Sequence, residues 1–343
     1  MKQSINILAI ETSCDETSAA VISDGMLRSN IIASQIDIHA LYGGVVPEIA
    51  SRNHLINLPE VVDEAMLQAQ INFADLDAVS VTYGPGLVGA LLIGVSYAKA
   101  LAFGLGKKLI GVNHLAGHIS ANFLTGAKPP FICLVISGGH TMIVHVKDYT
   151  EFEVLGSTRD DAAGEAFDKV ARVMGLGYPG GPKLDLLAES GDPHFIEFPR
   201  VMLEESHFDF SFSGLKSAVL NFINRETMKG NEINKADLCA SFRQCVSDIV
   251  TEKTIRAAEK LGIATVCICG GVSCNSLIRS EFVRKCEQRG MELFLPDQLL
   301  CSDNAGMIAA AAYFQYKNND FADIYLNAIP SLTLMQSAKS DRK

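Results

Sequence analysis

Residues 5–22 read INILAIETSCDETSAAVI, which is an apolar run, a polar turn and a second apolar run. Apolar runs of this length, bounded by turn residues, are typical of strands. The pattern recurs at residues 131–147, FICLVISGGHTMIVHVK, where the turn is SGGHT. Two strand–turn–strand units of the same kind predict two related lobes that face a cleft.

Helical patterns alternate with strand patterns along the chain. Residues 46–70 are mostly helical in pattern, and Pro59 is expected to kink or divide the helix. Residues 77–83 read as a strand, and a Gly-Pro-Gly turn then leads into an apolar helix at about 88–105. Because such alternation is typical of sheets covered by helices, we expect an α/β fold.

The composition is that of a folded, acidic protein. Hydrophobic residues make up 48% of the 343 positions, charged residues make up 20%, and the net charge is −10. A chain of this length allows two lobes with substantial cores. The acidic balance argues against a generic nucleic-acid coat protein, because non-specific binding depends on basic surface, but it leaves a local basic patch open.

The sequence also carries signals of cellular location. Nine cysteines are scattered without a CxxC pattern, which is typical of reduced thiols in the cytoplasm. The first residues lack the layout of a signal peptide. The apolar stretch at 86–106 could be mistaken for a membrane span, but Lys99 interrupts it and a buried helix explains it better. We therefore expect a cytoplasmic protein with no membrane association.

The segment 113–119, NHLAGHI, places His114 and His118 four residues apart. On a helix this spacing brings two side chains onto one face, where two imidazoles can share a metal ion. Taken by itself, the spacing favours two ordinary core or surface histidines over a metal site. A metal site needs a third ligand from elsewhere, and carboxylates near helix starts, such as Asp303, are candidates. The Glu of HExxH is absent, which disfavours a zinc protease.

Three glycine-rich turns follow predicted strands or helices, at 137–141, 177–182 and 269–275. Glycine allows the backbone to approach a ligand closely and to direct N–H groups at phosphate oxygens. Three such turns favour a nucleotide site, although the chain contains neither a Walker A motif nor a GxGxxG fingerprint in a βαβ unit.

Two acidic residues each allow more than one interpretation. Asp168 lies inside a predicted helix, where Asp is a poor helix former, so its position suits a ligand role and a surface role equally. Glu11 lies where a strand meets a polar turn, and it could face a metal or a reacting proton, or simply be solvated.

Ten motifs together resemble, in the same order, the tRNA N6-adenosine threonylcarbamoyltransferase family. Between residue 11 and about residue 311 they read ETSCDET, HALYGGVVPEIASRNH, GPGLVGALLIG, NHLAGH, SGGHT, DDAAGEAFDK, YPGGP, FSFSGLK, GGVSCN and CSDNAGMIA. The resemblance implies an α/β fold of two duplicated actin-like (ribonuclease-H-like) lobes with a nucleotide cleft between them. We expect the first lobe to comprise residues 1–112 and about 304–343, and the second, 113–303, to hold the metal and acyl-adenylate site.

The resemblance also implies a reaction, that of a metal-dependent acyltransferase that modifies tRNA. The threonylcarbamoyl group of threonylcarbamoyl-AMP would be transferred to N6 of adenosine 37 in tRNAs that read codons beginning with A, and AMP would leave. Because an exocyclic adenine amine is a poor nucleophile, positioning it beside an activated mixed anhydride should supply much of the rate.

Matched residue by residue, the motifs imply two groups of site residues. His114, His118 and Asp303 match the metal ligands, and the metal is expected to be Fe2+, with Zn2+ as the alternative. Residues that match positions around the acyl-adenylate are Ile136, Ser137, Gly138, Gly139, His140, Asp168, Gly181, Asp185 and Asn275. We add Glu11 as a candidate acceptor of the amine proton.

The expected partners also follow from the resemblance. They are tRNA and threonylcarbamoyl-AMP as substrates, and a paralogous actin-like subunit, an ATPase subunit and an adenylate-forming synthase as proteins. We expect the paralogous subunit to bind the first lobe, because residues 46–70 and 100–106 contain more apolar positions than one buried face requires.

Two other functions are weighed against the transferase. A small-molecule kinase of the same fold would share the glycine-rich turns, but it would not need an HxxxH pair with a distant Asp. A heat-shock-70-like binding module would append a peptide-binding domain, for which we find no counterpart after residue 330.

Overall fold

The structure is a computed structural model, and it describes residues 4–334. The chain divides into two compact α/β units. Unit 1 contains the residues up to 128, residues 147–152 and the residues from 296 onward, whereas unit 2 contains residues 129–146 and 153–295. Each unit is built on one five-stranded sheet, which confirms the predicted α/β class and the predicted repeat.

The sheet of unit 1 has the strand order β3-β2-β1-β4-β5. Its strands are β1 (Asn6–Glu11), β2 (Glu16–Ser23), β3 (Met26–Ser34), β4 (Ala78–Gly84) and β5 (Lys108–Asn113). β1 pairs antiparallel with β2 and parallel with β4. The opening sequence at 5–22 is therefore β1, a turn and β2, as its two apolar runs predict.

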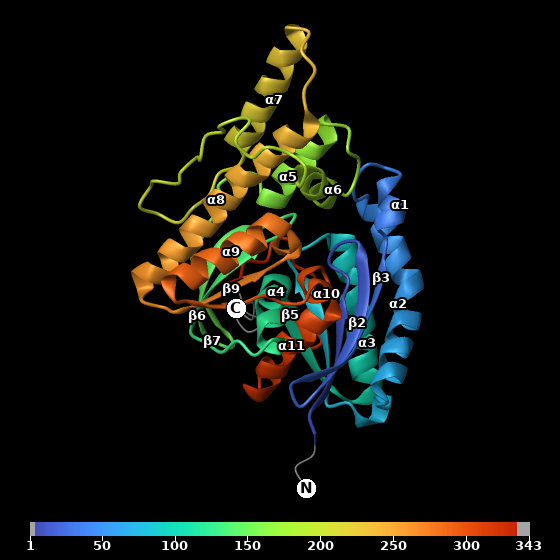
Figure 1. The fold of residues 1–343 in the computed structure, drawn as a ribbon. Helices are drawn as coiled ribbons and strands as arrows, with labels where there is room; N and C mark the ends of the chain where they lie inside the picture. The colour runs from blue at the N-terminus through green and yellow to red at the C-terminus, as the bar shows by residue number, and fades with distance from the viewer. Residues whose placement is uncertain (1–3, 335–343) are drawn as a thin grey trace. The chain divides into compact units, whose positions relative to one another are not determined.

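Both faces of this sheet are covered by helices, because successive side chains of a strand point to opposite faces. Leu8 and Ile10 of β1 pack with α2 and α3, whereas Ile7 and Ala9 pack with α4 and α11. The helices of unit 1 are α1 (Ile36–Ala40), α2 (Pro47–Ala69), α3 (Val88–Leu105), α4 (His114–Leu124), α10 (Gln298–Cys301) and α11 (Ala305–Lys317), with a 3-10 turn η1 (Phe73–Asp75). Figure 1 shows α2 and α3 side by side along the sheet.

Helix α2 continues through Pro59, so the expected division of the 46–70 helix does not occur. Proline removes one helical hydrogen bond, here the bond to the carbonyl of Leu55. Because Leu55 is exposed, water can satisfy that carbonyl.

Helix α3 is long and apolar enough to cross a membrane by length and composition alone, and it is the one such helix among residues 4–334. One face of α3 packs on β4 in the core of unit 1, with Leu91 and Val95 buried. Its other face leaves Val88, Leu92 and Phe103 exposed. The predicted buried helix is therefore buried along one side.

The sheet of unit 2 repeats the arrangement of unit 1. Its order is β10-β9-β6-β7-β8, and β6 pairs antiparallel with β7 and parallel with β9, as β1 does with β2 and β4. The strands are β6 (Phe131–Ile136), β7 (Thr141–Asp148), β8 (Glu151–Ser157), β9 (Thr265–Cys269) and β10 (Glu292–Phe294).

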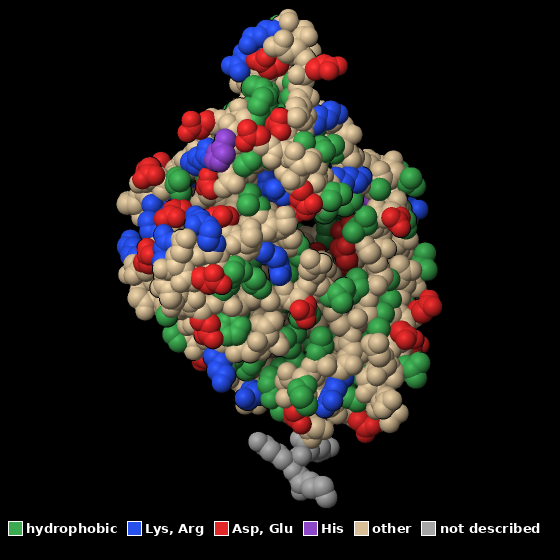
Figure 2. Space-filling model, viewed as in Figure 1, with side chains coloured by type: hydrophobic (Ala, Val, Ile, Leu, Met, Phe, Trp, Pro, Cys, Tyr) green, Lys and Arg blue, Asp and Glu red, His purple; other side chains and the backbone are tan. Residues whose placement is uncertain are grey.

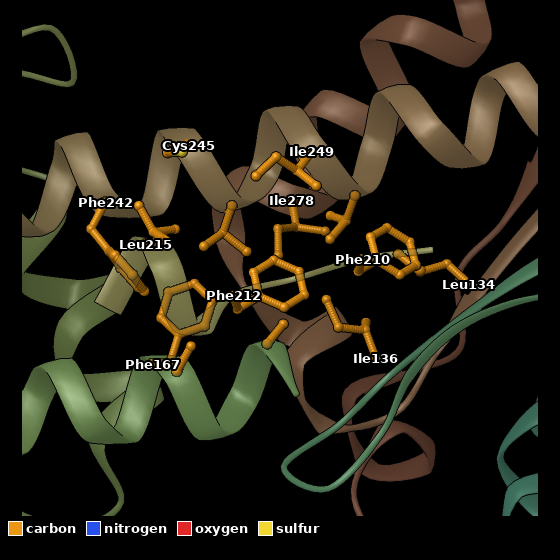
Figure 3. Close-up of a cluster of buried hydrophobic side chains, with 14 of the residues drawn as sticks. Leu134, Ile136, Phe167, Phe210, Phe212, Leu215, Phe242, Cys245, Ile249 and Ile278 are labelled. Atoms are coloured by element: carbon orange, nitrogen blue, oxygen red, sulfur yellow. The ribbon is translucent and has the colours of Figure 1, made fainter. Parts of the chain in front are cut away.

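Helices α5 to α9 build the core of unit 2. They are α5 (Ala163–Val173), α6 (Gly180–Ala188), α7 (Ser213–Met228), α8 (Lys235–Leu261) and α9 (Ser276–Arg289), with a 3-10 turn η2 (Gly271–Cys274). Figure 3 shows how Phe167 of α5 and Phe242 of α8 meet beside Phe212, with Ile136 of β6 and Ile278 of α9 nearby. This apolar layer fixes the helices against the end of β6.

Unit boundaries in the structure differ from the predicted boundaries at 112/113 and 303/304. Helix α4 lies in unit 1 because Gly117 lets it approach α11: a Cβ atom on Gly117 would lie 2.6 Å from Cδ1 of Ile308. The tip of the β7–β8 hairpin also joins unit 1, where the ring of Tyr149 stacks on Phe314 at 4.0 Å. The histidine pair therefore belongs to unit 1 and not to the second lobe.

Candidate metal centre and ligand-binding turns

His114 and His118 lie on one face of α4, as their spacing predicts. The helix begins at His114 because the side chain of Asn113 caps it, accepting hydrogen bonds from the backbone N–H groups of Leu115 and Ala116 at 2.9 and 3.3 Å. The centres of the two imidazole rings are 4.6 Å apart, and the rings meet edge to face. Both side chains are buried.

Asp303 completes the group from a distant part of the sequence. It directly precedes Asn304, the residue that caps the first turn of α11. The Oδ1 atom of Asp303 lies 3.4 Å from Nε2 of His114 and 3.3 Å from Nε2 of His118. All three ligand atoms lie within 4.8 Å of one another, so one metal ion could contact all of them.

The protonation states of Asp303 and His118 suit a divalent cation. Burial favours a neutral Asp303, but the imidazoles of His114 and His118 outweigh it and hold the pKa of this carboxyl well below its usual range. Burial lowers the pKa of His118, whose Nδ1 and Nε2 accept no hydrogen bond from the described residues. An ionised carboxylate and a neutral imidazole with buried nitrogens are the forms that bind a metal.

His114 is oriented from its other side by Glu11. Nδ1 of His114 lies 3.1 Å from Oε2 of Glu11, which also accepts a hydrogen bond from Oγ1 of Thr82 at 2.6 Å. Oε1 of Glu11 accepts a hydrogen bond from the backbone N–H of Ser13 at 2.5 Å. Glu11 is completely buried, and these donors use both of its oxygens. A carboxylate behind a ligating histidine is a common way to fix the ring and its tautomer.

The turn after β1 brings further carboxyl groups close to the histidine pair. Burial, followed by the charges of Asp303 and Asp15, raises the pKa of Glu16 to about 10. The pKa of His114 is raised as well: burial lowers this pKa, but Asp303 and Glu11 outweigh burial and raise it well above the ordinary value. Carboxylates crowded in this way are stabilised by a cation, so the donor set and its surroundings fit a metal ion.

Unit 2 holds the turn SGGHT between β6 and β7. The backbone N–H of Ser137 donates to the carbonyl of His140 at 2.8 Å, and the backbone N–H of His140 donates to Oγ of Ser137 at 3.2 Å. Gly138 and Gly139 are exposed, and a Cβ atom at either position would meet nothing within 4 Å. The turn is therefore closed by its own hydrogen bonds and open on the side of its two glycines.

The other two glycine-rich turns gather at the same end of β6. A Cβ atom on Gly270, in the turn after β9, would lie 2.5 Å from the carbonyl oxygen of Ile136. The third turn is held by α5, because Oδ1 of Asp168 accepts hydrogen bonds from the backbone N–H groups of Gly180 and Gly181 at 2.9 and 3.1 Å. The first residues of α5 in turn contact Ser137, through the N–H of Gly164. Ligands of open α/β sheets bind at such carboxyl ends of parallel strands.

Asp185 and Asn275 are also brought together in unit 2. Oδ1 of Asp185 accepts hydrogen bonds from Nδ2 of Asn275 at 2.8 Å and from Arg243 at 2.7 Å, and its Oδ2 accepts one from the backbone N–H of Ser276 at 2.9 Å. Both oxygens of the Asp185 carboxylate therefore accept hydrogen bonds from protein donors. Sequence reasoning missed Arg243, although a charged residue within the apolar stretch of α8 is a signal for a buried ion pair.

Comparisons with known proteins give consistent results. The family model of tRNA N6-adenosine threonylcarbamoyltransferase matches residues 26–310. A tRNA N6-adenosine threonylcarbamoyltransferase of Clostridium botulinum (strain Kyoto / Type A2) is 57% identical over 97% of this chain and 99% of its own length. The protein of the same name from Moorella thermoacetica is 57% identical over 96% of this chain and 97% of its own length.

Two solved structures support the fold alone. Full-length HypF in its phosphate- and nucleotide-bound form aligns with a TM-score of 0.64 at 15% identity, over 93% of this chain and 47% of HypF. Component A of (R)-2-hydroxyglutaryl-CoA dehydratase from Acidaminococcus fermentans aligns with a TM-score of 0.52 at 17% identity, over 92% of this chain and 98% of that protein. Both likenesses agree with the predicted actin-like α/β architecture.

Proposed function

The chain belongs to the tRNA N6-adenosine threonylcarbamoyltransferase family, and on this premise we propose that it transfers the threonylcarbamoyl group of threonylcarbamoyl-AMP to N6 of adenosine 37. The substrates are tRNAs that read codons beginning with A, the second product is AMP, and the reaction takes place in the cytoplasm. The observation that carries the proposal is the match to the family along nearly the whole chain. The same match disfavours the kinase and the heat-shock-70-like module.

His114, His118 and Asp303 are the proposed ligands of a divalent metal ion, Fe2+ with Zn2+ as the alternative. Bound there, the ion would act as a Lewis acid that neutralises negative charge on phosphate and carbonyl oxygens. The convergence of the three side chains within 4.8 Å and the buried nitrogens of His118 support this assignment.

Glu11 is proposed as a residue that orients His114. Both of its oxygens accept hydrogen bonds from the protein, and the side chain is completely buried. This arrangement favours orientation over the role of proton acceptor that we expected from the sequence. A proton acceptor would have to contact the adenine amine.

The turn Ile136–His140 is proposed to hold the acyl-adenylate in unit 2. Its two exposed glycines allow a ligand to approach the backbone closely. Asp168 and Gly181 are proposed to contact the same ligand, because Oδ2 of Asp168 accepts no hydrogen bond from residues 4–334 and can receive one from a ribose hydroxyl.

Asn275 is also proposed to face the acyl-adenylate, and Asp185 is proposed to support it. The carboxylate of Asp185 receives donors from Arg243, Asn275 and Ser276, so that it fixes the Asn275 amide in place of contacting the ligand itself. This refines the direct contact that the resemblance implies for Asp185.

Recognition of tRNA is proposed to require the partner proteins. On the face shown in Figure 2, Lys and Arg side chains are interspersed with Asp and Glu side chains. Ion pairs among the described residues include Arg284 with Glu281 at 2.6 Å and Arg289 with Glu259 at 2.9 Å. Together with a net charge of −10, this pattern supports little non-specific affinity for RNA from this chain alone.

The paralogous actin-like subunit is proposed to bind the outer face of α2 and α3. Large apolar side chains exposed there are Leu55, Ile56, Val88 and Leu92. The two helices approach closely at this place, because a Cβ atom on Gly89 would lie 2.5 Å from Oγ of Ser51. The ATPase subunit and the adenylate-forming synthase remain proposed partners from the family resemblance.

The proposal is tested by incubating the chain, its partners and the metal with threonylcarbamoyl-AMP and unmodified tRNA, followed by mass spectrometry of the nucleosides. We expect threonylcarbamoyladenosine in a tRNA with A37 and none in the same tRNA with G37. Phosphorylation of a small molecule at the expense of ATP, without any modified nucleoside, would contradict the proposal.

A further inference from the structure

His54 is a completely buried histidine on α2 whose two ring nitrogens have partners in the turn after β1 and at the start of β2. Nε2 lies 2.9 Å from the carbonyl oxygen of Cys14, and Nδ1 lies 2.8 Å from Oγ1 of Thr17. A carbonyl oxygen can only accept, so Nε2 carries the proton. Nδ1 of the neutral ring then accepts the hydroxyl proton of Thr17, and the tautomer is fixed.

The turn that His54 holds is the turn that contacts the metal ligand His114. Its Ser13 hydroxyl lies 3.1 Å from Nδ1 of His114, the ring nitrogen that also faces Glu11. The carbonyl of Ser13 accepts a hydrogen bond from the backbone N–H of Leu87 at 2.8 Å. Three contacts therefore fix the turn. His54 of α2 binds the carbonyl of Cys14, Leu87 at the start of α3 binds the carbonyl of Ser13, and Glu11 accepts a hydrogen bond from the backbone N–H of Ser13.

A second buried histidine nearby shows that these contacts are not a general property of the core. His39 on α1 is as completely buried as His54. Its Nδ1 accepts a hydrogen bond from the backbone N–H of Val46 at 3.2 Å, and its Nε2 has no hydrogen-bond partner among the described residues. His39 thus closes the connection between α1 and α2, whereas His54 reaches the turn beside the metal ligands.

We propose that His54 is a positioning residue: by donating a hydrogen bond to the carbonyl of Cys14, it holds the turn after β1 so that Ser13 and Glu11 fix the ring of His114 for metal binding. The inference rests on the proposed metal site and deepens it. Partners behind a ligating histidine commonly change metal affinity 10- to 100-fold, and His54 acts one residue further away, so we expect about a tenfold effect.

The test measures metal binding by the full-length chain, with Co2+ as the probe. His54→Leu removes the donor and should weaken Co2+ affinity about tenfold in competition with a chelator, and it should change the visible d–d bands of the Co2+-saturated protein. His54→Gln places an amide N–H near the position of Nε2, so it should restore most of the affinity and of the spectrum. Circular dichroism confirms that each variant is folded.

His39→Leu is the matched control, because it removes an equally buried imidazole whose ring nitrogens make no hydrogen bond to the turn among the described residues, and it should leave Co2+ affinity and the spectrum unchanged. The proposal is overturned if His54→Leu binds Co2+ like the unsubstituted chain, if His54→Gln is no better than His54→Leu, or if His39→Leu loses as much affinity. Absence of Co2+ binding by the unsubstituted chain would overturn the metal site itself, together with the role of His54.

Discussion

Nδ1 of His114 lies 3.1 Å from Oε2 of Glu11, inside unit 1 and across 103 residues of sequence. The opposite nitrogen of the same ring faces Asp303 at 3.4 Å. One imidazole therefore connects a buried carboxylate at the end of β1 to the candidate metal position, where His114 and His118 of α4 meet Asp303.

If Glu11 orients His114, the variant Glu11→Gln should lose metal affinity 10- to 100-fold because the amide holds the ring less firmly. At saturating metal, its single-turnover rate of threonylcarbamoyl transfer should return to near that of the unsubstituted chain. Chelator competition and rapid-quench kinetics measure the two quantities. A metal-saturated variant that is still inactive would restore Glu11 as the proton acceptor.

Substitution of Gly164 by Ala should damage the SGGHT turn. A Cβ atom there would lie 2.6 Å from the carbonyl oxygen of Ser137 and 2.8 Å from Cα of Gly138, and these backbone atoms cannot move without shifting the turn. We expect a loss of about 1–3 kcal/mol in the free energy of unfolding and a raised KM for threonylcarbamoyl-AMP, with unchanged metal affinity.

Gly104→Ala provides the control for Gly164→Ala, since an added Cβ atom at Gly104 on α3 meets nothing within 4 Å. It should be neutral, or stabilising by up to about 1 kcal/mol, because alanine favours a helix. A normal KM in Gly164→Ala would show that the turn does not hold the adenylate.

The contributions of Asp185 and Arg243 to the free energy of unfolding should be strongly coupled, because the two side chains form an ion pair. Both side chains are largely buried, so Asp185→Ala leaves the guanidinium without its anion and should cost about 3–5 kcal/mol. In the double variant Asp185→Leu with Arg243→Met, the loss should be clearly smaller than the sum of the single losses. Urea unfolding monitored by circular dichroism gives the cycle, and additive losses would contradict the coupling.

Because the pKa of Lys253 is lowered in the folded chain, we expect the free energy of unfolding to depend on pH. This lysine of α8 is completely buried, and its Nζ donates to the carbonyl oxygen of Asp209 at 2.5 Å. Burial, with the charge of Arg256 as the next cause, lowers its pKa to about 8 from an ordinary 10.5. Between these values the unfolded chain binds more protons than the folded chain, so the free energy of unfolding rises with pH in this window.

The variant Lys253→Met lacks this contribution, so its stability relative to the unsubstituted chain should fall as the pH rises from about 8 to 10. Lys260→Met, at an exposed position two turns further along α8, is the control and should show no such trend. Urea titrations at several pH values measure the difference, and parallel curves for Lys253→Met and the unsubstituted chain would contradict the lowered pKa.

How much of the site could be predicted from the sequence depended on how far apart its residues lie along the chain. His114 and His118 share a helix, so their spacing alone placed them on one face. Asp303 was one candidate among several carboxylates, and only the family resemblance singled it out. The bonds of Glu11 to His114 and of Asp185 to Arg243 join residues far apart in sequence, and no local pattern encodes such pairs.

The fold shows the same limit. The strand–turn–strand repeats were visible as apolar runs, because a buried strand is apolar over its own length. The unit boundaries differ from the predicted ones at α4, whose place depends on the close approach of Gly117 to Ile308 and not on its neighbours in sequence. Likewise, Pro59 gave a local signal for a break, but the packing of α2 on the sheet overrode it.

The central claim is that His114, His118 and Asp303 together hold the metal ion that transfer requires. Anomalous diffraction from crystals of the metal-loaded chain, recorded on both sides of the iron or zinc absorption edge, tests it most directly. The account predicts a single strong peak within bonding distance of Nε2 of both histidines and of the Asp303 carboxylate. A transfer-active protein with no peak at these three residues, or with its metal bound elsewhere, would contradict it.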